Sequence, residues 1–155
     1  MAFYSQLDNN GYGIYTSTGN GVITTIADSE ATNGGMFRNF GDNQRINASG
    51  TVAFFANLDA GGSGIFASYS GSTLPFAVVK TGDVLFGSEV TDVSLSMALN
   101  DNNQLAFQYQ LADFRRGVAV ANITAVAVPE VGSLALVACG LLAGVGVVAR
   151  RHTSR

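Results

Sequence analysis

Residues 52–68 have the sequence VAFFANLDAGGSGIFAS, in which two short apolar segments flank a glycine-rich turn. Residues 52–58 alternate in the manner of a strand and are rich in β-branched and aromatic side chains. Residues 59–63 supply turn-forming residues, and residues 64–69 return as a second strand. This stretch therefore predicts a β-hairpin.

The same pattern occurs three times along the chain. Residues 1–17, MAFYSQLDNNGYGIYTS, align with residues 52–68 without a gap, and a third copy, LAFQYQLADFRRGVAVA, occupies residues 105–121. Repetition with a period near 50 residues is typical of proteins built from stacked structural units. The shared positions are an Ala-Phe pair, a leucine and a central glycine: Ala2-Phe3, Ala53-Phe54 and Ala106-Phe107; Leu7, Leu58 and Leu111; Gly13, Gly64 and Gly117.

Two further strands per unit are expected, near residues 74–79 and 93–97. Residues 21–26 have their counterpart in residues 73–78, whereas residues 29–41 and 81–92 diverge and have the composition of loops. Four strands in about 50 residues predict a propeller-like blade, because a small twisted sheet buries both faces only against neighbouring sheets. The expected fold of residues 1–122 is therefore an all-β array of partial propeller-like blades.

The number of repeats raises a question about the start of the chain. Roughly two and a half units are present, whereas closed propellers typically have about four to eight blades. Met1 also occupies the position equivalent to Val52, inside a repeat. We therefore expect the chain to be the C-terminal piece of a longer protein with further blades and an export signal. A short two-unit β-sandwich is the alternative.

Charge and the rare reactive residues exclude several functions. Charged side chains make up only 12% of the chain, and the first 149 residues hold 5 basic and 11 acidic ones. An acidic body argues against nucleic acid as a partner. The only cysteine and histidine are Cys139 and His152, so residues 1–122 have no thiol nucleophile, imidazole base or Cys/His metal cluster. We expect no catalytic residues, no metal and no cofactor.

Acidic residues in or beside the divergent segments leave one enzymatic alternative open. A pair of carboxylates can hydrolyse a glycosidic bond without histidine or cysteine. Such a pair would make the protein a polysaccharide-acting enzyme, whereas solvated loop carboxylates are the simpler interpretation. The candidates are Asp28, Glu30, Asp83, Glu89 and Asp92.

The C-terminal segment predicts one membrane crossing. Residues 131–149 carry no charge and are long enough, as a helix, to cross most of a hydrocarbon core about 30 Å thick. The arginines that follow favour a cytoplasmic C-terminus, which places the repeats on the other side of the membrane. Residues 123–128 are the expected linker. The arginines are Arg150, Arg151 and Arg155.

Two family resemblances rest on these segments. Residues 47–54, NASGTVAF, and the degenerate copy that runs from Asn100 to Phe107 resemble the NxxGxxAF tandem repeats of bacterial surface proteins with interchangeable C-terminal anchors. The first of these has Asn47 and Gly50 at the motif positions, whereas the second has Asn103 in place of glycine. Residues 129–155, preceded by Val128, resemble a PEP-CTERM sorting signal: Val128-Pro129-Glu130, an apolar span and an arginine-rich end, with Val131 where a second proline is expected.

These resemblances imply an exported protein of a Gram-negative bacterium. An exosortase, which is a membrane-embedded processing enzyme, would recognise Val128, Pro129 and Glu130 and act on the non-cytoplasmic side. Before processing, the protein would be a single-pass inner-membrane protein, and afterwards it would reach the cell surface or the extracellular matrix. The implied role is noncatalytic, either structural or binding, with an extracellular polysaccharide as a further partner.

Overall fold

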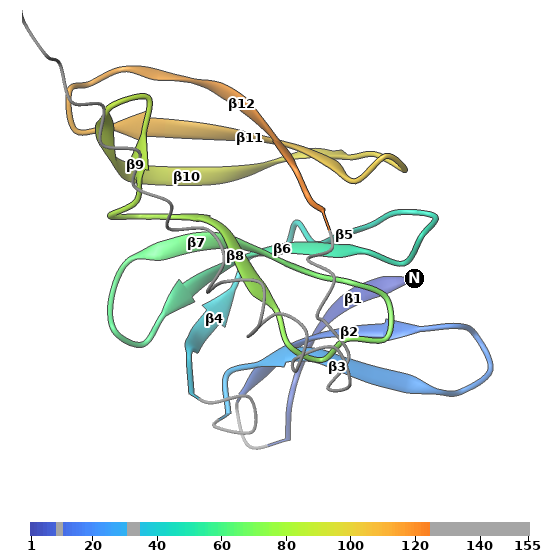
Figure 1. The fold of residues 1–155 in the computed structure, drawn as a ribbon. Helices are drawn as coiled ribbons and strands as arrows, with labels where there is room; N and C mark the ends of the chain where they lie inside the picture. The colour runs from blue at the N-terminus through green and yellow to red at the C-terminus, as the bar shows by residue number, and fades with distance from the viewer. Residues whose placement is uncertain (9–10, 31–34, 125–155) are drawn as a thin grey trace, which may run out of the picture. The chain divides into compact units, whose positions relative to one another are not determined.

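The computed structural model describes residues 1–8, 11–30 and 35–124, which contain twelve β-strands and no helix. The strands form three antiparallel sheets, coloured blue, green and yellow to orange in Figure 1. The predicted all-β fold is therefore confirmed. The first sheet contains β1 (Ala2–Gln6), β2 (Tyr12–Ser17) and β3 (Ile23–Asp28); the middle sheet contains β4 (Phe37–Phe40), β5 (Arg45–Ile46), β6 (Val52–Leu58), β7 (Ser63–Ser68) and β8 (Phe76–Lys80); the third sheet contains β9 (Val84–Leu85), β10 (Ser88–Leu99), β11 (Gln104–Leu111) and β12 (Arg116–Asn122).

All three predicted hairpins are present, as β1–β2, β6–β7 and β11–β12. The expected third strand follows as β3 in the first sheet and β8 in the middle sheet. The hairpin turns are also alike, because the N–H group of each equivalent leucine donates to the carbonyl oxygen four residues later. The pairs are Leu7–Gly11 (2.8 Å), Leu58–Gly62 (3.1 Å) and Leu111–Arg115 (2.9 Å).

Residues 29–41 and 81–92, which were expected to be loops, contain strands instead. β4 pairs with β6 and the first part of β10 pairs with β11, and a bulge follows Phe37 in one case and Val90 in the other. Phe37 and Phe40 are buried, as are Val90 and Val93 at the equivalent positions 53 residues later. The repeat therefore continues through these segments. The repeat is hard to see in the sequence because apolar character is retained at the buried positions while residue identity is not.

The middle sheet is buried on both of its faces. Side chains that alternate along β6 point to opposite sides, as they do in any strand. Val52, Phe54, Ala56 and Phe66 form a core with Ile14 of β2, Ile26 and Ala27 of the first sheet, together with Phe37 and Phe40 of β4. On the other side, a second core contains Ala53, Ile65, Ala67 and Val79 together with residues of the third sheet, among them Leu105 and Phe107. Stacking of sheets thus buries both faces, as the repeat pattern predicts.

The sheets also stack in the same orientation. We call the side of each sheet that bears Phe3, Phe54 or Phe107 its phenylalanine face, and the side that bears Ala2, Ala53 or Ala106 its alanine face. Ala2 and Tyr4 pack on the core that contains Phe54, and Ala53 shares a core with Phe107. The alanine face of one sheet therefore contacts the phenylalanine face of the next, twice within the described residues.

Residues 1–124 form one compact unit. Within the part of the chain that the structure describes, no helix has the length and apolar character needed to cross a membrane. The predicted sorting motif Val128, Pro129 and Glu130, the predicted crossing at 131–149 and the basic tail at 150–155 lie outside the described residues.

Candidate functional site

The asparagine of the NxxGxxAF motif closes the turn that precedes the second and the third repeat hairpin. Asn47 Oδ1 accepts a hydrogen bond from the Thr51 N–H group (2.9 Å), and Asn100 Oδ1 accepts one from the Gln104 N–H group (2.8 Å). Short polar side chains favour turns because they can bond to nearby backbone groups in this way. The motif asparagine therefore has a structural role in both turns.

The fourth position of each turn requires a positive φ. Gly50 has a φ of 81° and Asn103, which replaces the expected glycine, has a φ of 57°. Glycine adopts this conformation without steric penalty, and asparagine tolerates it better than most other residues. Asn103 therefore preserves the turn conformation although it replaces the glycine of the motif.

Neighbouring turns are bonded to each other across the sheets. Asn47 Nδ2 donates to the Asn100 carbonyl oxygen (3.0 Å) and to Asn103 Oδ1 (2.7 Å). The Ala48 N–H group donates to Asp101 Oδ1 (2.8 Å). Asn47 is buried and uses both its amide oxygen and its amide nitrogen. One side chain thus closes its own turn and links the middle sheet to the third.

The repeated glycines lie beneath aromatic rings. A Cβ on Gly64 would lie 3.0 Å from Phe66 Cε2, and a Cβ on Gly117 would lie 2.8 Å from Tyr109 Oη. Both distances are too short for a side chain to fit without displacement of the ring. An aromatic ring over a strand glycine covers backbone that would otherwise be exposed. The three pairs are Gly13–Tyr15, Gly64–Phe66 and Gly117–Tyr109.

The five candidate carboxylates are spread over two sheets rather than gathered in one site. Asp28 ends β3 of the first sheet and accepts a hydrogen bond from the Glu30 N–H group (3.1 Å). Asp83 pairs with Lys80 Nζ at 3.0 Å in the turn between β8 and β9, and the other two candidates, Glu89 and Asp92, are exposed on β10. Among the described residues, no group of three or more His, Cys, Asp or Glu side chains could hold a metal ion. Asp28 is buried, Glu30 and Asp83 are half-buried, and the five carboxylates do not converge on one site.

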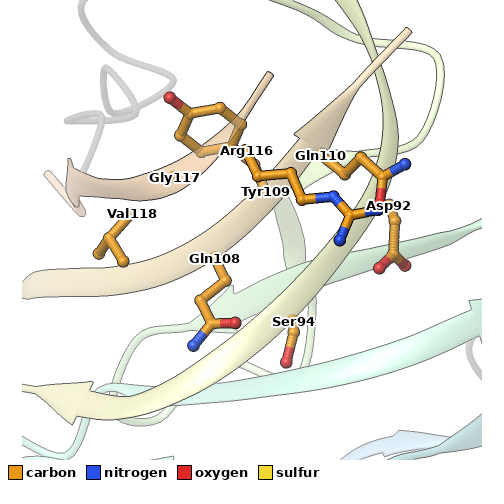
Figure 2. Close-up of a pocket in the computed structure, with 8 residues that line it drawn as sticks. All are labelled: Asp92, Ser94, Gln108, Tyr109, Gln110, Arg116, Gly117 and Val118. Carbon is orange, nitrogen blue, oxygen red and sulfur yellow. The ribbon is translucent and has the colours of Figure 1, made fainter. Parts of the chain in front are cut away.

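An open polar depression of about 370 Å³ lies on the alanine face of the third sheet (Figure 2). Strand pairing places Asp92 opposite Gln110, and Gln108 opposite Val118. The carboxylate, amide and guanidinium groups of this lining can form hydrogen bonds. The depression is lined by Asp92, Ser94, Gln108, Tyr109, Gln110, Arg116, Gly117 and Val118.

A second depression of about 460 Å³ lies at the edge of the middle and third sheets. Its groups are mostly neutral amides and hydroxyls with one arginine. Several are fixed by hydrogen bonds: Asn57 Nδ2 donates to Asn39 Oδ1, and Thr91 Oγ1 donates to the Gln110 carbonyl oxygen (3.2 Å). Such groups can both donate and accept hydrogen bonds. The polar lining side chains of this edge depression are Arg38, Asn39, Asn57, Ser63, Thr81 and Thr91.

The phenylalanine face of the first sheet carries an aromatic pair. The rings of Phe3 and Tyr15 stack with their centroids 5.7 Å apart. Burial raises the pKa of the Tyr15 phenol above its ordinary value, and the negative charges of Asp28 and Glu30 raise it further. The phenol therefore stays protonated and neutral at physiological pH.

A family model with the description "Family of unknown function (DUF7453)" matches residues 4–135. The chain belongs to the DUF7453 family. The match includes most of β1 and all later strands, so the stacked repeat hairpins of this protein lie within the DUF7453 region. No curated protein and no solved structure matches the chain.

Proposed function

We propose that this DUF7453 protein is an exported surface or extracellular-matrix protein whose β-repeat module has a noncatalytic, structural or binding role. The proposal rests on the structural roles of the repeat residues. Asn47 and Asn100 close turns, Gly50 and its counterpart Asn103 shape them, and the Ala-Phe pairs and glycines pack sheets together. Repeated residues whose contacts stabilise turns and cores are typical of a scaffold protein. The stacked sheets are proposed to be blades of a propeller-like array.

We propose that the C-terminal segment directs the protein to its destination. The support is the order of sequence features: Pro129-Glu130, the uncharged span 131–149 and the arginines from Arg150 onward. An exosortase-type enzyme would process a single-pass inner-membrane precursor and release the module to the surface or matrix. Both the membrane and this enzyme are therefore proposed partners.

The test is the location and mass of the mature protein. A Pro129→Ala, Glu130→Gln double variant is expected to keep its tail and to remain in the inner membrane, whereas the wild-type protein loses the residues from about Pro129 onward. Pro75→Ala is the matched control, because Pro75 is the other proline of the chain and lies outside the motif. A full-length tail on wild-type protein at its final location would show that the segment is an ordinary anchor.

We further propose an extracellular polysaccharide as a ligand of the edge depression. The neutral amide and hydroxyl groups there suit a polyhydroxylated chain, and exposed Arg38 could bond to sugar hydroxyls or carboxylates. An Arg38→Ala, Thr91→Ala double variant is expected to lose retention on the host's own polysaccharide. Gln108→Ala, in the depression of Figure 2, is the control and is expected to bind normally. Release of reducing sugar would instead support the polysaccharide-acting enzyme.

A further inference from the structure

Two exposed phenylalanines occupy turn positions that usually hold glycine or asparagine. Phe86 and Phe114 have φ values of 52° and 68°, in the left-handed region where a bulky side chain costs conformational free energy. The two residues are 60% and 85% exposed, so burial offsets little of this cost. Strained residues that packing does not explain are candidates for a function.

The equivalent turn of the middle sheet shows what the backbone alone requires. The hairpin turns of the middle and third sheets are closed by the same hydrogen bonds, with Gly61 (φ 91°) in the place of Phe114. Phe86 precedes Gly87 (φ 82°) in the two-residue turn between β9 and β10, and Asn-Gly is the preferred pair in a turn with two positive φ values. Folding therefore requires a phenylalanine at neither position.

Hydrogen bonds of one arginine hold the two turns together at the same end of the third sheet (Figure 1). Arg115 Nη2 donates to the Phe86 carbonyl oxygen (3.0 Å), and Arg115 Nε donates to Asp113 Oδ2 (2.8 Å). The side chain next to Phe86 in β9, Val84, is also apolar and is 75% exposed. We call Val84, Phe86 and Phe114 the apolar tip.

We propose that the apolar tip inserts into the surface of a phospholipid bilayer. It combines aliphatic and aromatic side chains on projecting turns, and none of the three lines the depressions described above. A bilayer surface accepts apolar side chains of any shape, whereas a small ligand needs a concave site. The guanidinium of Arg115, whose side chain is 53% exposed at the base of the tip, can donate hydrogen bonds to lipid phosphates.

The length of the chain beyond the described residues keeps the tip within reach of a membrane. Residues 125–130 separate Thr124 from the predicted span 131–149, and an extended segment of this length covers at most about 25 Å. β12, which leads away from the tip, has 7 residues and is therefore about 23 Å long. The tip could thus reach the bilayer that holds the proposed precursor. The inference rests on the proposed function only for this encounter, because insertion depends on the tip itself.

The experiment uses tryptophan fluorescence, because the chain contains no tryptophan and a single one reports on its own surroundings. The full-length Phe86→Trp and Phe114→Trp variants are reconstituted into phosphatidylethanolamine–phosphatidylglycerol vesicles with brominated acyl chains. Emission from both is expected to move to shorter wavelength and to lose intensity relative to vesicles without bromine, because bromine quenches indole on contact. Leu74→Trp is the matched control, since Leu74 is 76% exposed beyond the far end of β7, and its emission is expected to stay unchanged.

A substitution that removes strain separates membrane contact from stability. In the Phe86→Trp background, Phe114→Gly is expected to weaken the quenching and to leave the urea midpoint no lower, because glycine adopts a positive φ without steric cost. A lower urea midpoint with unchanged quenching would show that the ring serves folding, and it would overturn the proposal.

The remaining outcomes distinguish the tip from the predicted span. Vesicle-bound protein whose tip variants are quenched no more than Leu74→Trp would overturn the proposal and leave the span intact, and protein that does not bind vesicles would overturn both. Quenched protein that alkaline carbonate removes from the vesicles would support the tip and contradict the span. A shift of Phe114→Trp emission caused by the host's polysaccharide, without any shift caused by vesicles, would assign the tip to that ligand and overturn the proposal.

Discussion

The turn containing Asn47 gives the sharpest test of how the sheets are held together. Asn47 and Asn100 occupy equivalent positions 53 residues apart, and each closes its own turn through Oδ1. They differ in the amide nitrogen: Asn47 Nδ2 donates to two acceptors in the next turn, whereas Asn100 Nδ2 donates to Gln104 Oε1 at an exposed site. Replacement of each asparagine by aspartate keeps the oxygen and removes the donor.

The expected free energies follow from these bonds. Each intramolecular hydrogen bond contributes a net of about 0.5–1.5 kcal/mol, so loss of the two inter-sheet bonds destabilises Asn47→Asp by about 1–3 kcal/mol. A carboxylate that faces the Asn100 carbonyl oxygen adds repulsion. Asn100→Asp is expected to change stability by less than about 0.5 kcal/mol, because water replaces the exposed Gln104 contact. Asn47→Ala, which also opens its own turn, is expected to cost about 2–4 kcal/mol.

Urea unfolding followed by far-ultraviolet circular dichroism measures these differences in the full-length protein. The m-value should stay constant across the variants, since the surface exposed on unfolding is unchanged. If the two aspartate variants lose the same stability within about 0.5 kcal/mol, the bonds between turns contribute nothing and the reasoning is wrong.

Three further predictions concern the core, the repeated glycine and pH. Phe54→Ala removes a fully buried ring and is expected to lower the free energy of unfolding by about 3–5 kcal/mol in the same urea assay. Gly64→Ala places a Cβ 3.0 Å from a ring carbon of Phe66 and 2.9 Å from the Lys80 Cβ, so it should cost about 1–3 kcal/mol by calorimetry, and a result within about 0.5 kcal/mol of wild type would contradict the packing role. The raised pKa of Tyr15 means that the folded state favours the neutral phenol; its contribution to stability is present below about pH 10 and is lost as the pH rises through the raised pKa. Tyr15→Phe should therefore lose less stability than wild type as the pH rises above about 10, and identical profiles would argue against it.

The sequence was sufficient for the hairpins because their signals are local and repeated. Three local features predict a strand and its hairpin partner: the alternation along residues 52–58, glycine in the turns and the recurring Ala-Phe pair. The strands within residues 29–41 and 81–92 were not predictable in the same way. β4 and the start of β10 each have a buried apolar residue followed by a bulge, Phe37 in one and Val90 in the other, but they share almost no residue identity.

The polar depressions could not be located from the sequence. Asp92 and Gln110 are 18 positions apart and become neighbours only through the pairing of β10 with β11. The partner of Asn47 Nδ2 was equally hidden, since Asn103 lies one repeat period and three residues further along the chain. Residue type predicted the turn at Asn47, but contacts between turns depend on how whole sheets stack.

The common orientation of the three sheets also bears on how the gene can change. Every sheet presents one phenylalanine face and one alanine face, so a duplicated or deleted unit of about 53 residues leaves matching faces at each new junction. Recombination within the Asn-x-x-Gly turn would exchange whole units and preserve the turn itself. We therefore expect homologous genes to differ in the number of units by unequal crossing-over, with substitutions that adjust side-chain volume in the core at each new junction.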